Sequence, residues 1–316
     1  MISKNKIFNI ENKSIFVAGH NGMVGSATVN ELKKKSNELL CLDRKILDLQ
    51  NEEKVLQWFQ YNKPQIVIIA AAKVGGIYAN NTYPVDFIEN NLRIQNNLIR
   101  ASHITGVEKL VFLGSSCIYP KYSQQPIKEE YILSGLLEPT NEAYAIAKLA
   151  GIKLCEAYSK QYDCNFISLL PTNLYGPNDN FHPKFSHVPA ALLRRFHEAK
   201  INKQKSVLVW GTGRPRREFL HVSDLAKGII HMLEYYSSSK PINIGTGKDI
   251  SIKEFSEMIA EVVGYDGKID YDNTKPDGTP LKKLDISKAL SYGWQPEISL
   301  KTGIRSTYEW ALKNIF

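Results

Sequence analysis

A tyrosine and a lysine one helical turn apart are the side chains in this sequence best suited to move a proton. Tyr144 and Lys148 form a Tyr-x-x-x-Lys motif, and side chains four positions apart lie on the same face of a helix. A neighbouring ammonium favours the phenolate, so it lowers the pKa of a tyrosine toward the working pH and lets the hydroxyl exchange the proton that accompanies hydride transfer. Ser115, which follows an apolar segment, would hydrogen-bond the same carbonyl oxygen. On its own the motif is more often a surface helix pair, so its context has to decide.

A glycine-rich turn supplies that context. The apolar run at 14–19 (SIFVAG) predicts a buried strand, and the pattern at 22–35 predicts an amphipathic helix. Glycines between them let backbone N–H groups approach a pyrophosphate at the N-terminus of the helix. A plain glycine turn is the alternative. The residues that we expect to contact a dinucleotide here are Gly19, Asn21, Gly22, Met23, Val24 and Gly25.

The residues after the second predicted strand bear on which dinucleotide is bound. Asp43 suits the ribose hydroxyls of NAD, whereas Arg44 suits the 2′-phosphate of NADP. Both residues are present, so the pair alone leaves the choice open. We predict NADP(H), because Arg44 supplies a positive charge for the phosphate.

The elements that must position these groups alternate between strands and helices. Near-continuous apolar strands separated by helices are typical of a parallel sheet covered on both faces. We therefore predict an α/β fold, a Rossmann-type doubly wound parallel sheet, with Ser115 at the carboxyl end of the fourth strand, where such sheets bind ligands. Strands are predicted at 14–19, 38–43, 65–70, 109–115 and 165–171, and helices at 22–35, 52–61, 84–105 and 142–161.

The sequence pattern changes at about Tyr175. Longer loops rich in Pro, Gly and Asn follow, among them YGPNDNFHPK, GTGRPRRE and TKPDGTPLK. We predict a dinucleotide-binding domain at 1–174, to which later segments return. The remaining residues, 175–316, are predicted to form a smaller, interleaved C-terminal domain that mainly binds substrate.

Composition narrows the class of protein. The chain has 316 residues, 43% of them hydrophobic, and Lys plus Arg exceed Asp plus Glu by 40 − 32 = 8, which suits an enzyme of one large or two joined domains. The positive excess is scattered, so we predict no nucleic-acid partner. The four cysteines show no CxxC pair, so we predict neither a metal site nor a disulfide framework. No apolar run is long enough to span a bilayer and no secretory leader is evident, so we predict a cytoplasmic protein without a membrane partner.

The GxxGxxG spacing of the glycine-rich turn resembles that of extended short-chain dehydrogenase/reductases, and longer strings over nearly the whole chain are similar to the GDP-L-fucose synthase family. The resemblance implies that Ser115, Tyr144 and Lys148 form a reductase triad. It also implies that Cys117 and His187 are the base and the acid of an epimerisation. The strings are GHNGMVGS at 19–26, AAKVGGI at 71–77, GSSCIYP at 114–120, EPTN at 138–141, PTNLYGP at 171–177, SHV at 186–188 and PDGTP at 276–280.

Sugar chemistry is consistent with these implied roles. A ketone at C4 acidifies the hydrogens at C3 and C5, so one base and one acid beside a stabilised enolate could invert both centres. Without the resemblance, Cys117 is better explained as a small buried hydrophobe and His187 as a hydrogen-bonding loop residue.

The resemblance also implies the remaining binding residues. Arginine forks suit diphosphate oxygens, and an aromatic ring offers a stacking surface. A solvated position is the alternative for Arg195 and Lys282, and a core position for Trp210. The implied cofactor contacts are Ala71, Lys148, Pro171, Asn173, Leu174 and His187, and the implied substrate contacts are Arg195, Trp210, Arg217, Asp277 and Lys282.

The chain departs from the relatives at two places. Asn21 stands where they carry an arginine, which removes one of two expected contacts to the 2′-phosphate. The order Leu281-Lys282-Lys283 replaces their Arg-Lys-Leu, which leaves open which residue supplies the cationic contact.

The resemblance implies an NADP-dependent sugar-nucleotide oxidoreductase that reduces the C4 ketone of a GDP-4-keto-6-deoxy sugar with NADPH, after epimerising C3 and C5 at the same site. The alternative is a C4 reductase that acts on an already epimerised GDP-4-keto sugar such as a GDP-heptose. The intact triad argues against a third possibility, a non-catalytic NADP-binding protein of the same fold. The helices at 84–105 and 142–161 resemble the pair that forms a four-helix dimer interface, so we predict a homodimer.

Overall fold

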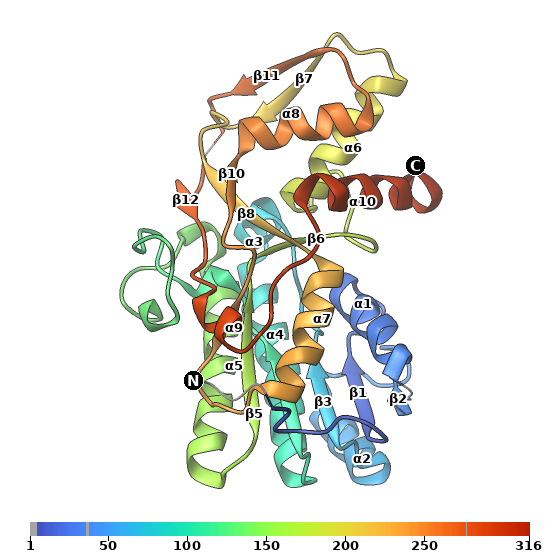
Figure 1. Ribbon diagram of the computed structural model, residues 1–316, viewed down its shortest axis with the longest axis vertical. Helices are drawn as coiled ribbons and strands as arrows, with labels where there is room; N and C mark the ends of the chain where they lie inside the picture. Colours follow the sequence, from blue (N-terminus) through green and yellow to red (C-terminus); the bar gives the residue numbers. More distant parts are fainter. Residues whose placement is uncertain (1–4, 36–37, 276) are drawn as a thin grey trace.

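A parallel sheet forms the centre of the larger part of the molecule (Figure 1). The computed structural model describes residues 5–35, 38–275 and 277–316. Within them, six strands pair in parallel in the order β2-β1-β3-β4-β5-β9, so the predicted doubly wound sheet is confirmed. The strands are β1 (Ser14–Ala18), β2 (Glu38–Leu40), β3 (Ile66–Ile69), β4 (Lys109–Leu113), β5 (Phe166–Pro171) and β9 (Ile242–Ile244).

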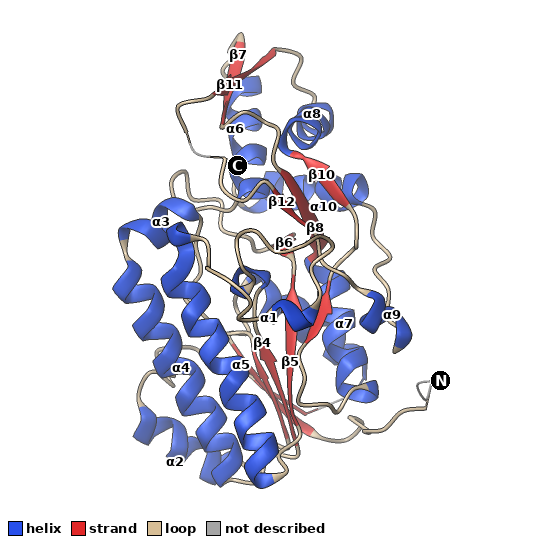
Figure 2. Ribbon diagram, turned by 90° about the vertical axis from the view of Figure 1, so that its left-hand side faces the viewer, coloured by secondary structure: helices blue, strands red, loops and turns tan. Residues whose placement is uncertain are grey.

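Helices cover both faces of this sheet, because successive strand residues point to opposite sides. Ile15 and Val17 pack in one core with α1 and α7, whereas Phe16 and Ala18 pack in a second core with α2, α4 and α5. Figure 2 shows α2, α4 and α5 as a layer of neighbouring helices on one side of the sheet. The helices are α1 (Met23–Leu32), α2 (Glu52–Asn62), α4 (Pro84–Ile104), α5 (Glu142–Tyr162) and α7 (Val222–Tyr235), with short helices α3 (Ile77–Thr82) and α9 (Ser287–Ser291).

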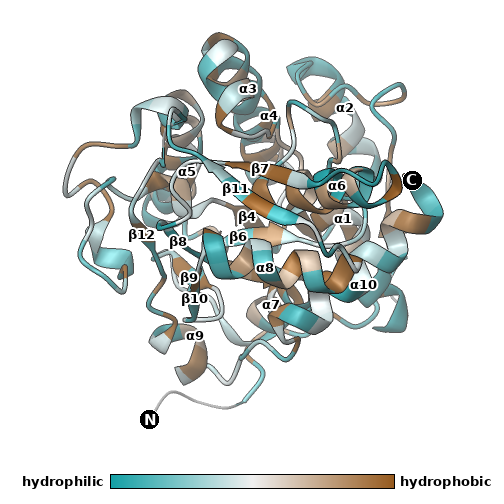
Figure 3. Cartoon of the chain, turned by 90° about the horizontal axis from the view of Figure 1, so that it is seen from above, coloured by the Kyte–Doolittle hydropathy of each residue, from teal (hydrophilic) through white to brown (hydrophobic). Residues whose placement is uncertain are grey.

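A smaller region lies at the carboxyl ends of the sheet strands, at the top of Figure 1. Its core, which includes Phe196, Phe255 and Ile304, is separate from the two cores of the large sheet. The helices alternate between hydrophilic and hydrophobic residues along their length (Figure 3), as expected where one face covers a core. They are α6 (Val188–Ile201), α8 (Ile252–Val263) and α10 (Leu300–Asn314).

The strands of the smaller region pair across long stretches of sequence. β8 pairs with β6 and β12 in parallel and with β10 in antiparallel orientation, while β7 pairs with β11. The later elements α7, β9 and α9 belong to the layers of the large sheet, and the boundary at residue 174 stays a prediction. The strands are β6 (Asn173–Tyr175), β7 (Ser206–Trp210), β8 (Arg216–His221), β10 (Asp249–Ser251), β11 (Lys268–Asp272) and β12 (Leu281–Lys282).

A buried carboxylate on β8 joins three of these segments. Glu218 accepts hydrogen bonds from the backbone N–H groups of Thr246 (2.5 Å), Gly247 (2.8 Å) and Leu284 (2.7 Å). Thr246 and Gly247 follow β9 of the large sheet, and Leu284 follows β12 of the smaller region. Glu218 therefore fixes the junction between the two parts of the molecule.

No helix among the described residues has the length and apolar character that crossing a bilayer requires. The same residues gather no group of three or more His, Cys, Asp or Glu side chains that could hold a metal ion.

A buried lysine at the start of β4 makes the stability of the fold depend on pH. The ammonium of Lys109 donates to the carbonyl of Tyr236 (2.6 Å) and the hydroxyl of Ser237 (2.9 Å), and it lies 5.0 Å from the ring centroid of Phe8. Burial without a carboxylate partner disfavours the charged form and lowers the pKa of Lys109 to about 7.

We expect the free energy of unfolding to rise with pH between about 7 and 10.5, because over this range the unfolded chain binds a proton at Lys109 that the folded chain does not. Chemical denaturation at several pH values measures this rise. It is expected to be smaller in Lys109→Met and unchanged in Lys13→Met, which removes an ammonium paired with Glu108. Equal pH dependence in the wild type and Lys109→Met would contradict the prediction.

Candidate active site

The candidate site begins where β1 and β3 end, which is where the strand order of the sheet reverses and such folds bind ligands. Gly19 has a φ of +85°, and a Cβ there would lie 2.7 Å from the Cα of Ala71. A Cβ on Gly25 would lie 2.0 Å from the carbonyl oxygen of Gly19. Both positions therefore require glycine, which lets the first helix approach the sheet closely.

The N-terminus of α1 fits a dinucleotide phosphate. Gly22 is the N-cap residue and no side chain caps the helix, so first-turn N–H groups have no intrahelical partner. Asn21 and Gly22 are exposed, which leaves this end of the helix open to an anion. The predicted contacts Gly22, Met23 and Val24 therefore lie where backbone N–H groups could bind a pyrophosphate.

The two residues that bear on cofactor choice lie beside the glycine-rich turn. Asp43 accepts a hydrogen bond from the side-chain amide of Asn21 (2.5 Å) and lies 3.6 Å from the imidazole of His20. Arg44 is largely exposed and lies 3.8 Å from Asp48. β2 ends at Leu40, earlier than predicted, so both residues sit in the loop that faces the turn.

Removal of the Asp43 carboxylate is expected to strengthen NADPH binding. A carboxylate at this edge repels a 2′-phosphate, while Arg44 attracts it. We expect Asp43→Ser to lower the dissociation constant of NADPH by about two- to fivefold and to leave that of NADH unchanged or raised. Quenching of tryptophan fluorescence at low and high salt measures both constants. Asp266→Ser, which removes a distant charge, is the control, and an unchanged NADPH constant in Asp43→Ser would refute the expectation.

The structure brings the three predicted reductase residues together. Ser115 follows β4, and its hydroxyl accepts the backbone N–H of Cys117 (3.2 Å) and hydrogen-bonds Tyr144. Lys148 is buried; its ammonium donates to the carbonyl of Leu113 (2.8 Å) and lies 5.9 Å from the ring centroid of Tyr144. Helix α5 therefore presents Tyr144 and Lys148 to the carboxyl end of β4, as the spacing predicted.

The electrostatics of this triad differ from the sequence expectation in one respect. Burial raises the pKa of Tyr144 above its ordinary value, although the Ser115 hydrogen bond acts in the opposite direction. Burial also lowers the pKa of Lys148 to about 8. The expected lowering of the Tyr144 pKa by Lys148 is therefore wrong for this structure, because desolvation dominates and the ammonium bonds to Leu113 instead.

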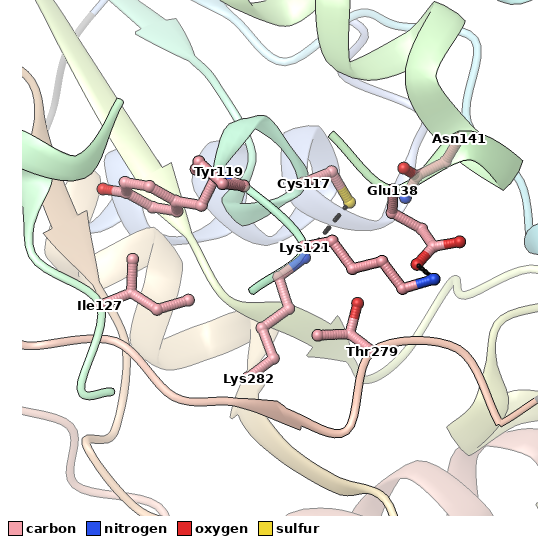
Figure 4. Close-up of a pocket in the computed structure, with 9 residues that line it drawn as sticks. Cys117, Tyr119, Lys121, Ile127, Glu138, Asn141, Thr279 and Lys282 are labelled. Atoms are coloured by element: carbon pink, nitrogen blue, oxygen red, sulfur yellow. Dashed lines mark hydrogen bonds and ion pairs between the residues drawn. The ribbon is translucent and has the colours of Figure 1, made fainter. Parts of the chain in front are cut away.

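A pocket lies beside the triad and contains the predicted base. The sulfur of Cys117 accepts a hydrogen bond from the ammonium of Lys282 (3.6 Å), and Lys121 pairs with Glu138 (2.9 Å), as Figure 4 shows. We call this the Cys117 pocket; it is lined by Cys117, Tyr119, Pro120, Lys121, Ile127, Glu138, Asn141, Thr279 and Lys282. One of the predicted substrate contacts, Lys282, is thus in direct contact with the thiol.

The other predicted substrate residues form two pairs in the smaller region. Arg195 donates to the carbonyl of Leu208 (2.7 Å), and its guanidinium lies 5.8 Å from the ring centroid of Trp210. Trp210 is 55% exposed, so it is not a core residue. Arg217 donates to the backbone carbonyl of Asp277 (3.2 Å). An exposed ring beside a guanidinium offers both stacking area and charge to a nucleotide.

Asp277 has a structural role in this arrangement. Its carboxylate accepts the backbone N–H (2.7 Å) and the hydroxyl (2.8 Å) of Thr212, so it holds the turn after β7. The PDGTP string that contains it begins at Pro276, which lies outside the described residues.

His187 lies at the N-cap of α6 and is exposed. Its imidazole has no hydrogen-bond partner in the described part of the chain. The backbone N–H of Gly76 donates to Phe185 (3.1 Å), which anchors the segment before His187 on the loop after β3. No contact joins His187 to Cys117 or Tyr144 among the described residues, so its role as the acid stays a prediction.

The remaining predicted cofactor residues lie at the ends of β3 and β5. Ala71 faces Gly19, and Pro171 is the last residue of β5. Asn173 donates to the backbone carbonyl of Glu218 (2.8 Å), and Leu174 packs against the core of the large sheet. They surround the same edge of the sheet as the glycine-rich turn.

Sequence reasoning missed several residues of the site. Glu138 and Asn141 line the Cys117 pocket, and the buried Oδ1 of Asn141 has no partner among the described residues. The EPTN string contained both of them but was used only as a mark of similarity. Asn91 was also missed. Its buried side chain hydrogen-bonds the backbone N–H (2.8 Å) and carbonyl (3.0 Å) of Lys73. The sequence could have indicated it, because it is a polar residue on the apolar face of a predicted helix.

The comparisons with known proteins identify the family. Residues 15–245 match the family described as the NAD dependent epimerase/dehydratase family. The chain belongs to this family. It is 56% identical over 302 residues to GDP-L-fucose synthase 1 of Arabidopsis thaliana, covering 95% of this chain and 94% of the relative. It is 52% identical over 310 residues to GDP-L-fucose synthase of Escherichia coli (strain K12), covering 95% and 97%.

Solved structures in the family agree with the fold. A GDP-L-fucose synthetase from Naegleria fowleri bound to NADP has a TM-score of 0.91 at 28% identity, covering 99% of this chain and 98% of that chain. A GDP-6-OMe-4-keto-L-xylo-heptose reductase from C. jejuni has a TM-score of 0.89 at 39% identity, covering 96% and 98%. The predictions of the family resemblance and of an NADP-dependent sugar-nucleotide enzyme are confirmed by these relatives.

Proposed function

We propose that this family member reduces the C4 ketone of a GDP-4-keto-6-deoxy sugar with NADPH, after epimerising C3 and C5 in the same site. The observation that carries the proposal is the placement of a thiol beside the reductase triad. Cys117 and Tyr144 are close enough to interact electrostatically, and both contact Ser115. A base and a proton donor thus share one site, as an epimerisation followed by a reduction requires.

In the reduction step, Tyr144 gives a proton to the C4 oxygen while Ser115 orients that oxygen through a hydrogen bond. When bound, NADPH supplies the hydride that C4 accepts. Lys148 donates to the carbonyl of Leu113 at the end of β4 and lies beside the ring of Tyr144, so it positions the phenol at the end of that strand.

In the epimerisation step, the thiolate of Cys117 removes a proton from C3 or C5. An S–H bond forms, the C–H bond breaks, and its electron pair moves to the C4 oxygen as an enolate. Tyr144 and Ser115 hold that oxygen. His187 returns a proton to the opposite face of the carbon, which inverts the centre.

The nucleotide end of the substrate is assigned to the smaller region. Trp210 and Arg195 offer a stacking surface next to a positive charge, and Arg217 offers a second charge at the edge of the Cys117 pocket. GDP combines an aromatic base with a diphosphate, so it matches this combination.

Incubation with GDP-4-keto-6-deoxy-mannose in D₂O, without and then with NADPH, tests the proposal. We expect deuterium to enter C3 and C5 without NADPH, followed by formation of GDP-L-fucose when NADPH is added; NMR and mass spectrometry measure both. Reduction without deuterium at C3 and C5 would reject the epimerase part.

The second candidate is a C4 reductase that receives an already epimerised GDP-4-keto sugar, such as a GDP-heptose. The observation that favours it is the similarity to the heptose reductase from C. jejuni. The D₂O experiment separates the two candidates, because only the first predicts exchange at both carbons.

The chain is further proposed to form a cytoplasmic homodimer through α4 and α5. These helices pack against each other and expose apolar side chains, namely Val85, Ile104, Ile146 and Tyr162. Pairing with the same helices of a second copy would cover them in a four-helix interface. Light scattering at micromolar concentration is expected to give twice the mass of the 35.8 kDa chain; a monomeric mass, or a dimer that Ile146→Asp leaves intact, would contradict this interface.

A further inference from the structure

We propose that Lys282 keeps Cys117 in its thiolate form, and that it acts on the thiol rather than on the nucleotide. The proposal rests on the proposed role of Cys117 as the base. It names a positioning residue for that base, because Lys282 acts through the sulfur.

The geometry of the Cys117 pocket carries the proposal. The ammonium of Lys282 points at the sulfur of Cys117 at 3.6 Å, from a strand more than 160 residues further along the chain. The backbone of Cys117 is held in place, because its N–H donates to the Ser115 hydroxyl. A hydrogen bond from an ammonium to sulfur is stronger when the sulfur carries a negative charge.

The other charged groups around the sulfur do not compete for the contact between Lys282 and Cys117. Glu138 faces the same pocket, but Lys121 pairs with it at 2.9 Å. In the described part of the chain, Lys282 forms no ion pair with a carboxylate. Its ammonium is therefore available to the sulfur.

Two further ionisable groups interact with Cys117. Arg217, which stands opposite Lys282 in the register of β8 and β12, adds a second positive charge. That charge is partly offset by Asp277. Tyr144, from α5, is the other group and is neutral when protonated. The net charge that faces the sulfur is positive, which favours the thiolate.

The neighbouring lysine, Lys283, provides a matched control for Lys282. Lys283 is the next residue of the chain, but its ammonium lies 3.4 Å from Asp249 and its backbone N–H donates to Gln125. Substitution of Lys283 removes the same charge from the next position of the chain, just after β12, without touching the sulfur. Lys282→Arg keeps a positive charge at the sulfur and should rescue the effect.

The test is the pH dependence of Cys117 alkylation by iodoacetamide in the full-length protein without substrate, with the modified residue identified by mass spectrometry. In Lys282→Met we expect the rate of Cys117 alkylation at neutral pH to fall by about tenfold. Such a fall corresponds to a shift of about one pH unit in the midpoint of the rate profile. Lys282→Arg should retain most of the rate and Lys283→Met all of it. An unchanged profile in Lys282→Met, or an equal shift in Lys283→Met, would overturn the proposal. If Lys282→Met does not fold, Lys282→Gln takes its place.

GDP binding distinguishes the proposal from the earlier assignment of Lys282 to the substrate. Calorimetry is expected to give the same dissociation constant for GDP in wild type and Lys282→Met. If Lys282→Met binds GDP more weakly but its Cys117 is alkylated at an unchanged rate, Lys282 would instead be assigned to nucleotide binding. Alkylation needs no turnover, so it reports on Lys282 even if the wild type shows no exchange in D₂O and the proposed function fails.

Discussion

Tyr144→Phe is expected to lower the rate of C4 reduction by about 100-fold or more, because it removes the proton donor and leaves the rest of the site in place. The ring of Tyr144 packs against Phe87 and lies beside Lys148, and phenylalanine preserves both contacts. The same change removes one of two hydroxyls that hold the enolate oxygen. Exchange of deuterium at C3 and C5 should therefore slow as well.

The measurement is the rate of NADPH oxidation at saturating substrate, together with the dissociation constant of NADPH. That constant is expected to stay unchanged, which shows that the cofactor still binds. Tyr61→Phe is the control: it makes the same change at an exposed position on α2. A near-normal rate in Tyr144→Phe would exclude this residue as the proton donor.

Gly25→Ala and Gly22→Ala are expected to impair cofactor binding for different reasons. A Cβ on Gly25 would lie 2.0 Å from the carbonyl of Gly19, which is backbone and cannot move aside cheaply. We expect the folded state to lose ~1–3 kcal/mol, as overpacked sites do, and NADPH binding to be lost with it. A Cβ on Gly22 meets only the Gly19 carbonyl at 3.4 Å, an ordinary contact.

Gly22→Ala should therefore unfold close to the wild-type midpoint and still bind NADPH at least tenfold more weakly, because the methyl group lies where the backbone must approach a phosphate. Thermal unfolding and fluorescence titration measure the two quantities. Equal destabilisation by both variants would mean that Gly22 also serves packing, and normal NADPH affinity in Gly22→Ala would place the phosphates elsewhere.

The large sheet was predictable because its strands are local and fully buried. Segments such as 66–69 and 110–113 are continuous apolar runs, and a parallel sheet requires such runs. The strands of the smaller region are as short as two or three residues and pair with distant partners. Their sequences carry no period of their own, so only tertiary pairing defines them.

The candidate site, like the fold, could be predicted from the sequence only where its residues are close together in the chain. Tyr144 and Lys148 share a helix, so spacing alone predicted that they share a face. The contact of Cys117 with Lys282 depends on the pairing of β12 with β8 and on the packing of that pair beside the end of β4. Local patterns do not encode such a contact, and the family resemblance had assigned Lys282 to the substrate.

The carboxylate of Glu218 constrains how the molecule can open to release its product. It holds backbone groups on both sides of the junction between the large sheet and the smaller region. A rotation that separated β8 from the segment after β9 would remove the Thr246 and Gly247 donors from a buried carboxylate, at a large cost in free energy. Opening is therefore expected to leave this junction closed, so that Lys282, two residues before Leu284, stays at the thiol throughout the turnover cycle.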